Sequence, residues 1–412
     1  MRQILYIGKF FPQKLLQHVA EDNKGKIGFS NHNFELSLIH GLRFQKDINV
    51  RFMSLPAVFS YPHNNQRSWI RAESYEEEGF SVFSIGYCNW VVVNRINKIC
   101  NTICYLFREF RRCKDDQLDI IVNTPTTEIL LPIHIAKHFT HKKITTTLIV
   151  PDIPAFISAM DKTNPIKKIV EGWVDRLSMK LAAKSDCLVL LTKAMMDFFN
   201  PSTPYIIMEG IVDIKSMDIQ VGKQLGPSRK SILYTGTLRR IFGVMNLVEA
   251  FEQINMDNVE LWICGSGEAQ TEIEQRAQLN PNIKFLGLLG SKETLCLQHQ
   301  ATVLVNPRTS AGKFTKYSFP SKTMEYLLSG NPVIANRLPG IPEEYFEYVL
   351  CPENESIEAL TRKLQDVLNM SDMEQLAIGK RGHDFIANQK NSKIQIGRIL
   401  NMIEAFDESA NK

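Results

Sequence analysis

The chain has 412 residues, of which 44% are hydrophobic and 22% charged, and its formal net charge is +4. This length favours two domains over a single hydrophobic core. The small positive excess comes without a nucleic-acid-binding motif, and no segment approaches the ~20 apolar residues of a membrane span, so neither a nucleic-acid partner nor a membrane crossing is expected.

Short apolar strand patterns dominate the first half of the chain. The predicted strands are QILYIG, INVRFMSL, FSVFSIG, LDIIVNT, ITTTLIV and CLVLLT. An amphipathic helix pattern, NHNFELSLIHGLRFQ, follows the first of them. Alternation of this kind is typical of a parallel sheet covered by helices on both faces.

The pattern breaks between residues 198 and 229 and then restarts. The second half reads as the strands SILYTGTL, VELWICG, IKFLGLL, ATVLVNP and PVIA, separated by helix patterns. We therefore predict a first Rossmann-like domain at 1–200 and a second at 201–392. A last helix at 393–412 is expected to return to the first domain.

The segment SFPSKTMEYLLSGNPVIA, residues 318–335, predicts a short helix followed by a buried strand. Ser318 would cap the helix, Pro320 suits its first turn, and Gly330 would end it. The polar side chains cluster near the helix start at Ser318, Lys322, Glu325 and Ser329. A phosphate at the helix start and a ribose at the carboxylate would fit this cluster, whereas the alternative is an exposed Lys322–Glu325 pair.

The order of motifs in the second half resembles glycosyltransferase family 4. These motifs are YTGTL, LWICGSGE, FLG, LVNP, the 318–335 segment and GIPEEY, and the match runs from about Ser231 to Val367. The first half matches more loosely, through GKIGFSNHNFE and VPDIP. The resemblance implies the GT-B fold, in which two doubly wound Rossmann-like domains face each other across a cleft. It also implies a retaining, hexosyltransferase-like transfer from a nucleotide-sugar donor to a hydroxyl acceptor, as in bacterial surface polysaccharide or glycolipid synthesis.

Carried over residue by residue, the resemblance assigns Glu325 to the ribose hydroxyls and places Ser321 near the distal phosphate. Asp152 would face the transferred sugar or the acceptor. The predicted catalytic residues are Asp152, Arg240 and Tyr317. The predicted donor-binding residues are Gly28, Arg239, Leu286, Gly287, Arg308, Ser318, Phe319, Pro320, Ser321, Lys322 and Glu325.

Three positions depart from the family pattern. Tyr317 stands where the family has its first motif glutamate, and Thr237 and Phe242 stand where an arginine and a lysine are common. Arg239 and Arg240, in the same turn, would supply the missing charge. These departures leave open an alternative function, a non-catalytic nucleotide-sugar-binding or scaffold subunit with the same fold.

No metal or other cofactor is expected, because the chain contains no Asp-X-Asp for a metal clamp on the donor diphosphate. The expected partners are the nucleotide sugar and a saccharide or lipid-linked saccharide acceptor.

We predict a cytoplasmic protein, since the eight cysteines are scattered and Lys9 interrupts the first apolar run too early for a signal peptide. Residues 90–114 combine an apolar stripe with Arg95, Lys98, Arg108, Arg111, Arg112 and Lys114. This segment is either a helix lying on the inner face of an anionic membrane or a core-packed helix with solvated arginines.

Overall fold

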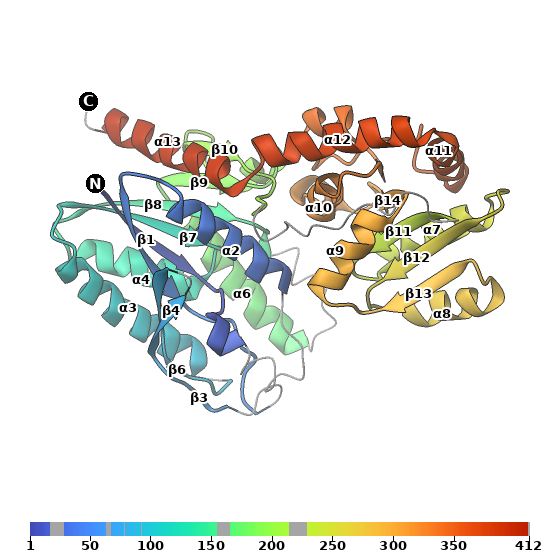
Figure 1. The fold of residues 1–412 in the computed structure, drawn as a ribbon. Coiled ribbons are helices and arrows are strands. Elements are labelled where there is room, and N and C mark those ends of the chain that lie inside the picture. The colour runs from blue at the N-terminus through green and yellow to red at the C-terminus, as the bar shows by residue number, and fades with distance from the viewer. Residues whose placement is uncertain are drawn as a thin grey trace. The chain divides into compact units, whose positions relative to one another are not determined.

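The computed structural model describes residues 1–16, 29–62, 67–77, 79–91, 93–154, 165–213 and 229–410. The chain divides into unit 1, Met1–Ile211 with Ser392–Lys412, and unit 2, Val212–Asn391 (Figure 1). Each unit contains a parallel sheet between helices, so the predicted doubly wound α/β architecture is confirmed for both.

Unit 1 is built on an eight-stranded sheet with the order β10-β9-β8-β7-β1-β2-β5-β4. Its strands are β1 (Arg2–Gly8), β2 (Ile48–Ser54), β4 (Glu73–Glu77), β5 (Phe80–Ser84), β7 (Gln117–Asn123), β8 (Lys143–Val150), β9 (Cys187–Leu190) and β10 (Tyr205–Ile207). All neighbours pair in parallel except β4 and β5. The apolar runs of the central strands are buried on both faces, as a covered parallel sheet requires.

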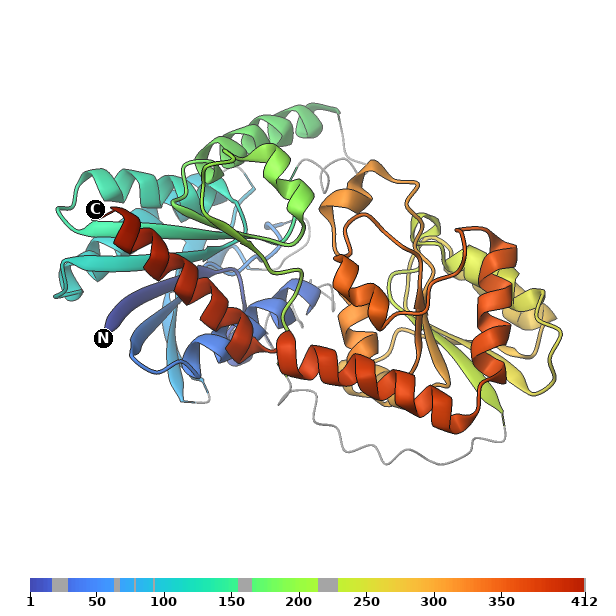
Figure 2. The same cartoon turned by 90° about the horizontal axis from the view of Figure 1, so that it is seen from above.

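Helices cover both faces of this sheet. On one face α2 (Phe29–Arg43) and α13 (Ser392–Ala410) share a hydrophobic core with alternate residues of the strands (Figure 2). A second layer consists of α3 (Asn94–Arg112), α4 (Thr127–His138) and α6 (Pro165–Ala182). A small antiparallel ribbon, β3 (Trp69–Ile70) with β6 (Tyr87–Cys88), lies apart from the main sheet.

Polar contacts attach α13 to unit 1. Asp407 accepts hydrogen bonds from Gln117 Nε2 at 2.6 Å and from Thr145 Oγ1 at 2.9 Å. Arg2 pairs with both Asp407 and Asp119.

The first domain boundary lies later than residue 200, because β10 pairs with β9 and so extends the sheet of unit 1.

Unit 2 contains a five-stranded parallel sheet with the order β13-β12-β11-β14-β15. Its strands are β11 (Lys230–Thr235), β12 (Val259–Cys264), β13 (Ile283–Gly287), β14 (Val303–Asn306) and β15 (Val333–Ala335). Its helices are α7 (Val244–Glu252), α8 (Gln270–Leu279), α9 (Ser291–Gln300), α10 (Lys322–Leu328), α11 (Ile357–Asn369) and α12 (Asp372–Gln389). Because all pairs are parallel, the carboxyl ends of the strands meet at one edge, where ligands bind in open α/β sheets.

None of the helices among the described residues combines the length and the apolar character that crossing a membrane requires.

Candidate functional site

Glycines hold the strand ends of unit 2 together. Gly236, Gly265 and Gly287 follow or end β11, β12 and β13. The Gly236 N–H donates to the Cys264 carbonyl at 2.9 Å, and the Gly265 N–H donates to the Gly287 carbonyl at 2.8 Å. At Gly265, whose φ is 146°, a Cβ would lie 1.8 Å from the Gly236 carbonyl oxygen. Only glycine fits there, and the strand ends consequently present backbone to a ligand rather than side chains.

Leu286 and Gly287, which were predicted to approach the nucleobase, lie at the end of β13. Both are half-buried, and Gly287 has a φ of 70°. Nothing among the described residues would touch a Cβ at Gly287, so this backbone borders open space. The backbone lies at the carboxyl edge of the sheet, where open α/β sheets bind ligands.

Glu325 of α10 has the best-defined environment in unit 2. Lys322 Nζ lies 2.9 Å from each carboxylate oxygen, and Gln298 Nε2 donates to Oε1 at 2.6 Å. The Glu325 side chain is 24% exposed, whereas Gln298 is completely buried. The Lys322–Glu325 pair therefore exists, but it is not a loose surface pair, because a core amide fixes the carboxylate.

Tyr326 attaches α10 to the end of β11. Its hydroxyl accepts from the Thr235 N–H at 2.8 Å and donates to the Thr235 carbonyl at 2.9 Å. Gln298 Nε2 also donates to Thr235 Oγ1 at 3.2 Å, and Asn331 Nδ2 donates to the Gln298 carbonyl at 2.8 Å. This buried network holds Glu325 beside the strand ends. Sequence reasoning missed Gln298; the signal that could have found it is that Gln298 is the buried residue of an otherwise partly exposed α9.

The start of α10 differs from the prediction. The helix begins at Lys322, and no side chain caps it. Ser318 has an extended backbone and ends the 3₁₀ turn η4 (Lys313–Tyr317), so the expected Ser318 cap is wrong. Phe319 and Pro320 are buried, and the Phe319 ring packs against Tyr345 with 5.2 Å between centroids. Packing of these two apolar side chains prevents the helix from starting earlier.

This packing decides which predicted residues remain available to a ligand. Phe319 and Pro320 offer only backbone atoms, whereas Ser321 is exposed and Lys322 is half-buried. Gly330, with a φ of 78°, follows the last turn of α10, as predicted.

Arg239 and Arg308 meet at one aromatic ring. The Arg308 guanidinium lies 5.2 Å from the Phe242 ring centroid, and the Arg239 guanidinium lies 5.7 Å from it. Arg308 is 8% exposed and also lies 4.6 Å from the Phe314 ring. Gly243, whose φ is 76°, allows this contact, because a Cβ there would lie 2.1 Å from the Pro307 carbonyl oxygen. The Phe242 ring is thus a common contact of two arginines.

Arg240 and Tyr317 contact other residues. Arg240 is exposed and forms an ion pair with Glu272 of α8. Tyr317 is half-buried at the end of η4, with Lys316 Nζ 4.5 Å from its ring centroid. Thr237 is exposed, and its carbonyl accepts from the Tyr234 hydroxyl at 2.9 Å.

In unit 1, Asp152 is exposed two residues after β8 and therefore lies at the carboxyl edge of that sheet. Gly28 lies outside the described residues.

A buried carboxyl group, Glu35 of α2, lies behind this edge and was not predicted. Glu35 is 1% exposed, and its two oxygens accept from the Lys9 N–H at 3.1 and 2.9 Å. The Tyr6 hydroxyl donates to Oε2 at 3.2 Å. A Cβ at Gly8 would lie 1.8 Å from Glu35 Oε2, so the carboxyl group fits only against glycine. Burial raises the pKa of Glu35 to about 7, although these hydrogen bonds oppose the shift.

In the described ranges no three His, Cys, Asp or Glu side chains are placed to hold a metal ion together.

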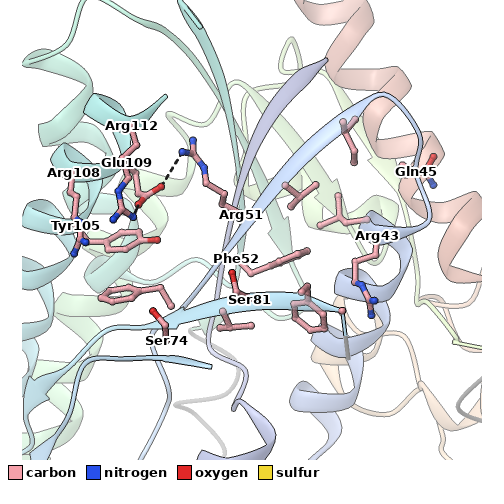
Figure 3. A pocket seen from close by; sticks show the side chains of 17 residues that line it. Arg43, Gln45, Arg51, Phe52, Ser74, Ser81, Tyr105, Arg108, Glu109 and Arg112 are labelled. Atoms are coloured by element: carbon pink, nitrogen blue, oxygen red, sulfur yellow. Dashed lines mark hydrogen bonds and ion pairs between the residues drawn. The ribbon is translucent and has the colours of Figure 1, made fainter. Parts of the chain in front are cut away.

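A cavity of about 510 Å³ lies at the opposite end of the unit 1 sheet, beside the last turns of α3 (Figure 3). Glu109, 1% exposed, accepts from Arg112 Nη1 at 3.0 Å and lies 3.2 Å from Arg51 Nη1. Arg108 lines the same cavity. Arg108 and Arg112, two of the basic residues noted in the 90–114 segment, therefore border this cavity.

The chain is similar to known proteins in part of its sequence and in its fold. Residues 229–370 match the family model described as Glycosyl transferases group 1. No curated protein sequence matches the chain.

Solved structures match over nearly the whole chain. Sucrose-phosphate synthase from Thermosynechococcus elongatus is 15% identical, with a TM-score of 0.63 over 98% of this chain and 100% of that one. The α,α-trehalose 6-phosphate synthase from Burkholderia multivorans is 11% identical, with a TM-score of 0.64 over 100% and 98%. A TarM variant from S. aureus, in complex with UDP and saccharides, is 14% identical, with a TM-score of 0.52 over 84% and 68%.

Proposed function

We propose that this protein, which is a glycosyltransferase with the GT-B fold, transfers a sugar from a nucleotide-sugar donor to a hydroxyl acceptor and retains the anomeric configuration. The observation that carries the proposal is the fixed, partly exposed carboxylate of Glu325 at the strand ends of unit 2. It lies within the segment that matches the glycosyl transferase family model.

Glu325 is suited to hold the ribose of the donor nucleotide. An ionised carboxylate only accepts hydrogen bonds, which complements the two hydroxyl donors of a ribose. Lys322 Nζ and Gln298 Nε2 both contact the carboxylate and keep it from rotating away. In this proposal the open backbone at Leu286 and Gly287 borders the nucleobase.

Arg239 and Arg308 are the proposed partners of the donor diphosphate. Both guanidinium groups lie near the ring of Phe242, a residue of the loop after β11. Planar guanidinium groups bind phosphate oxygens strongly and would stabilise the charge that develops on the leaving diphosphate. The exposed Ser321 and the backbone of residues 319–321 would add contacts to the distal phosphate. We propose that no metal ion is needed.

The reaction requires no covalent step by the protein. The bond between the anomeric carbon and the diphosphate oxygen breaks, and the acceptor oxygen bonds to the same face of that carbon. The acceptor proton passes to the departing phosphate. We propose that Asp152 orients the sugar or the acceptor, whereas Arg240 is a weaker catalytic candidate because it is paired with Glu272.

Tyr317 is the proposed contact to the donor sugar. Its hydroxyl both donates and accepts, and its ring is apolar, so it would suit a sugar face that carries fewer hydroxyl groups than the family's usual donors.

A thermal-shift panel of nucleotides and nucleotide sugars tests donor binding. Ligand binding to the folded state raises the melting temperature, so one nucleotide diphosphate sugar should stabilise the protein more than the others. The shift should be unchanged by EDTA. Absence of any shift across the panel would contradict the proposal, and a shift that EDTA abolishes would contradict metal-independent diphosphate binding.

The proposed setting is bacterial surface polysaccharide or glycolipid synthesis, with the enzyme on the inner face of the cytoplasmic membrane. Exposed apolar residues just before α3 and in its first turn support peripheral attachment: Trp90, Val91, Val93 and Ile96. The buried face of α3, in contrast, packs on the unit through Leu106 and Phe110.

Vesicle binding tests this attachment. We expect stronger binding to anionic than to neutral vesicles, and weaker binding as salt is added. Replacing Trp90 and Ile96 by serine should reduce binding to both vesicle types. Equal binding of the parent protein to both types would contradict attachment through positive charge, and absence of binding to either type would leave α3 a packed helix.

A further inference from the structure

A cluster of positive charge lies at the carboxyl edge of the unit 1 sheet. Lys9 directly follows β1, and Arg95 and Lys98 lie one turn apart at the start of α3. Glu128, in the first turn of α4, is the neighbouring anion. Three cations therefore lie close to Glu128, at the edge where open α/β sheets bind their ligands.

The Glu128 carboxylate is already engaged by Arg95. Arg95 Nε donates to Glu128 Oε1 at 2.8 Å. Burial acts to raise the pKa of Glu128, but the charges of Lys9 and Arg95 outweigh it and hold that pKa below its usual range. Glu35 is also close, but its oxygens are bonded to the Lys9 backbone N–H rather than to the Lys9 ammonium group.

Lys98 lies against an aromatic ring instead of an acid. Its Nζ is 4.2 Å from the Tyr87 ring centroid, and Tyr87 is fully buried. Within the described part of the chain, neither the Lys98 nor the Lys9 ammonium group forms a hydrogen bond or an ion pair. Burial first, and then the positive charge of Lys9, lower the pKa of Lys98 to about 8, against the attraction of Glu128.

Two neighbouring ammonium groups without a bound carboxylate are costly for the folded protein, because they repel each other and one of them is desolvated. A bound anion removes this cost. A phosphate fits better than a carboxylate, since its two negative charges match two ammonium groups and its oxygens accept from several directions.

We propose that Lys9 and Lys98 bind a phosphate group of the acceptor, so that the preferred acceptor is a saccharide bearing a phosphate. This inference rests on the proposed transferase function, because it assigns the carboxyl edge of unit 1 to the acceptor. Asp152, which follows β8 at the same edge, is then the residue that would face the attacking hydroxyl group.

Calorimetry with inorganic phosphate, glycerol 3-phosphate, dimethyl phosphate and acetate tests the site in the full-length protein. We expect the parent protein to bind inorganic phosphate and glycerol 3-phosphate more tightly than acetate. Dimethyl phosphate, a diester, shows whether a phosphate linked on both sides is accepted as well. Lys9→Met and Lys98→Met should each weaken phosphate binding about tenfold or more, since each removes a charge-assisted contact. Lys98→Arg should retain most of the affinity.

The matched control is Lys46→Met, which removes an exposed lysine of the same unit. It should bind phosphate as the parent does, and circular dichroism should show that all variants are folded. Because Lys98 packs on Tyr87, the Lys9→Met variant tests the site even if Lys98→Met is destabilised. Nucleotide affinity should be the same in every variant.

Unchanged phosphate binding in both methionine variants would overturn the proposal. A loss of nucleotide affinity in these variants would also overturn it, because the lysines would then belong to the donor site. If phosphate binding depends on the lysines but no sugar transfer is found, the anion site is supported and its assignment to an acceptor is overturned. If transfer proceeds equally well to phosphorylated and neutral saccharides, the transferase function stands and the inference is wrong.

Discussion

Glu325→Ala should abolish the stabilisation of the protein by its donor nucleotide. Each hydrogen bond to the carboxylate is expected to contribute ~1.5–3 kcal/mol, which corresponds to roughly a ten- to hundredfold loss of affinity per bond. Two ribose hydroxyls are the proposed donors, so the combined loss should exceed any other single substitution in unit 2. Isothermal titration with the best nucleotide of the panel measures it.

The matched control for this substitution is Glu347→Ala, which removes an exposed carboxylate elsewhere in unit 2. Its nucleotide affinity should equal that of the parent protein. Glu325→Ala also leaves Gln298 and Lys322 without their partner, so its fold must be checked by circular dichroism. A folded Glu325→Ala protein with parental nucleotide affinity would show that α10 does not form the ribose site.

Glu35→Gln should change how stability depends on pH. The pKa of Glu35 is about 7 in the folded protein against an ordinary value of 4.5, so between these values the folded state holds a proton that the unfolded state has released. Stability is therefore present at low pH and is lost as pH rises through this window. From pH 5 to pH 8 the parent should lose ~2–3 kcal/mol more of its unfolding free energy than the variant.

Urea denaturation at several pH values measures this difference. The control is Glu404→Gln, an exposed position on α13, which should follow the parent curve. Parallel curves for the parent protein and Glu35→Gln would mean that the Glu35 carboxylate is ionised in the folded state throughout this range.

The sequence predicted most of the sheets, because a strand in a covered parallel sheet is a continuous apolar run. Strands such as β7, β8 and β11 could be identified from composition alone. It failed for β4, whose sequence ESYEE is mostly charged. β4 lies at the edge of the sheet, where one side of the strand faces solvent and charge is tolerated, so hydrophobic patterning carries no signal.

The candidate site was predicted only in outline. The position of Glu325 follows from a helix wheel and from motif order, but its bond to Gln298 joins residues 27 positions apart, and no local pattern encodes it. The Ser318 cap failed for a similar reason, since packing of Phe319 against Tyr345 overrode local capping preference. Glu35 lies within the amphipathic pattern NHNFELSLIHGLRFQ, which does not indicate that this side chain is buried against Gly8.

The proposed reaction moves a sugar from a nucleotide to an acceptor hydroxyl with retention. Proton NMR of the reaction with the donor identified by thermal shift, in the presence of EDTA, tests it most directly, since the coupling constant of the anomeric proton reports the configuration of the product. We predict a glycoside with the same anomeric configuration as the donor, formed at a rate that Glu325→Ala reduces strongly. A product of inverted configuration, or no product beyond slow hydrolysis with every acceptor tried, would contradict the account.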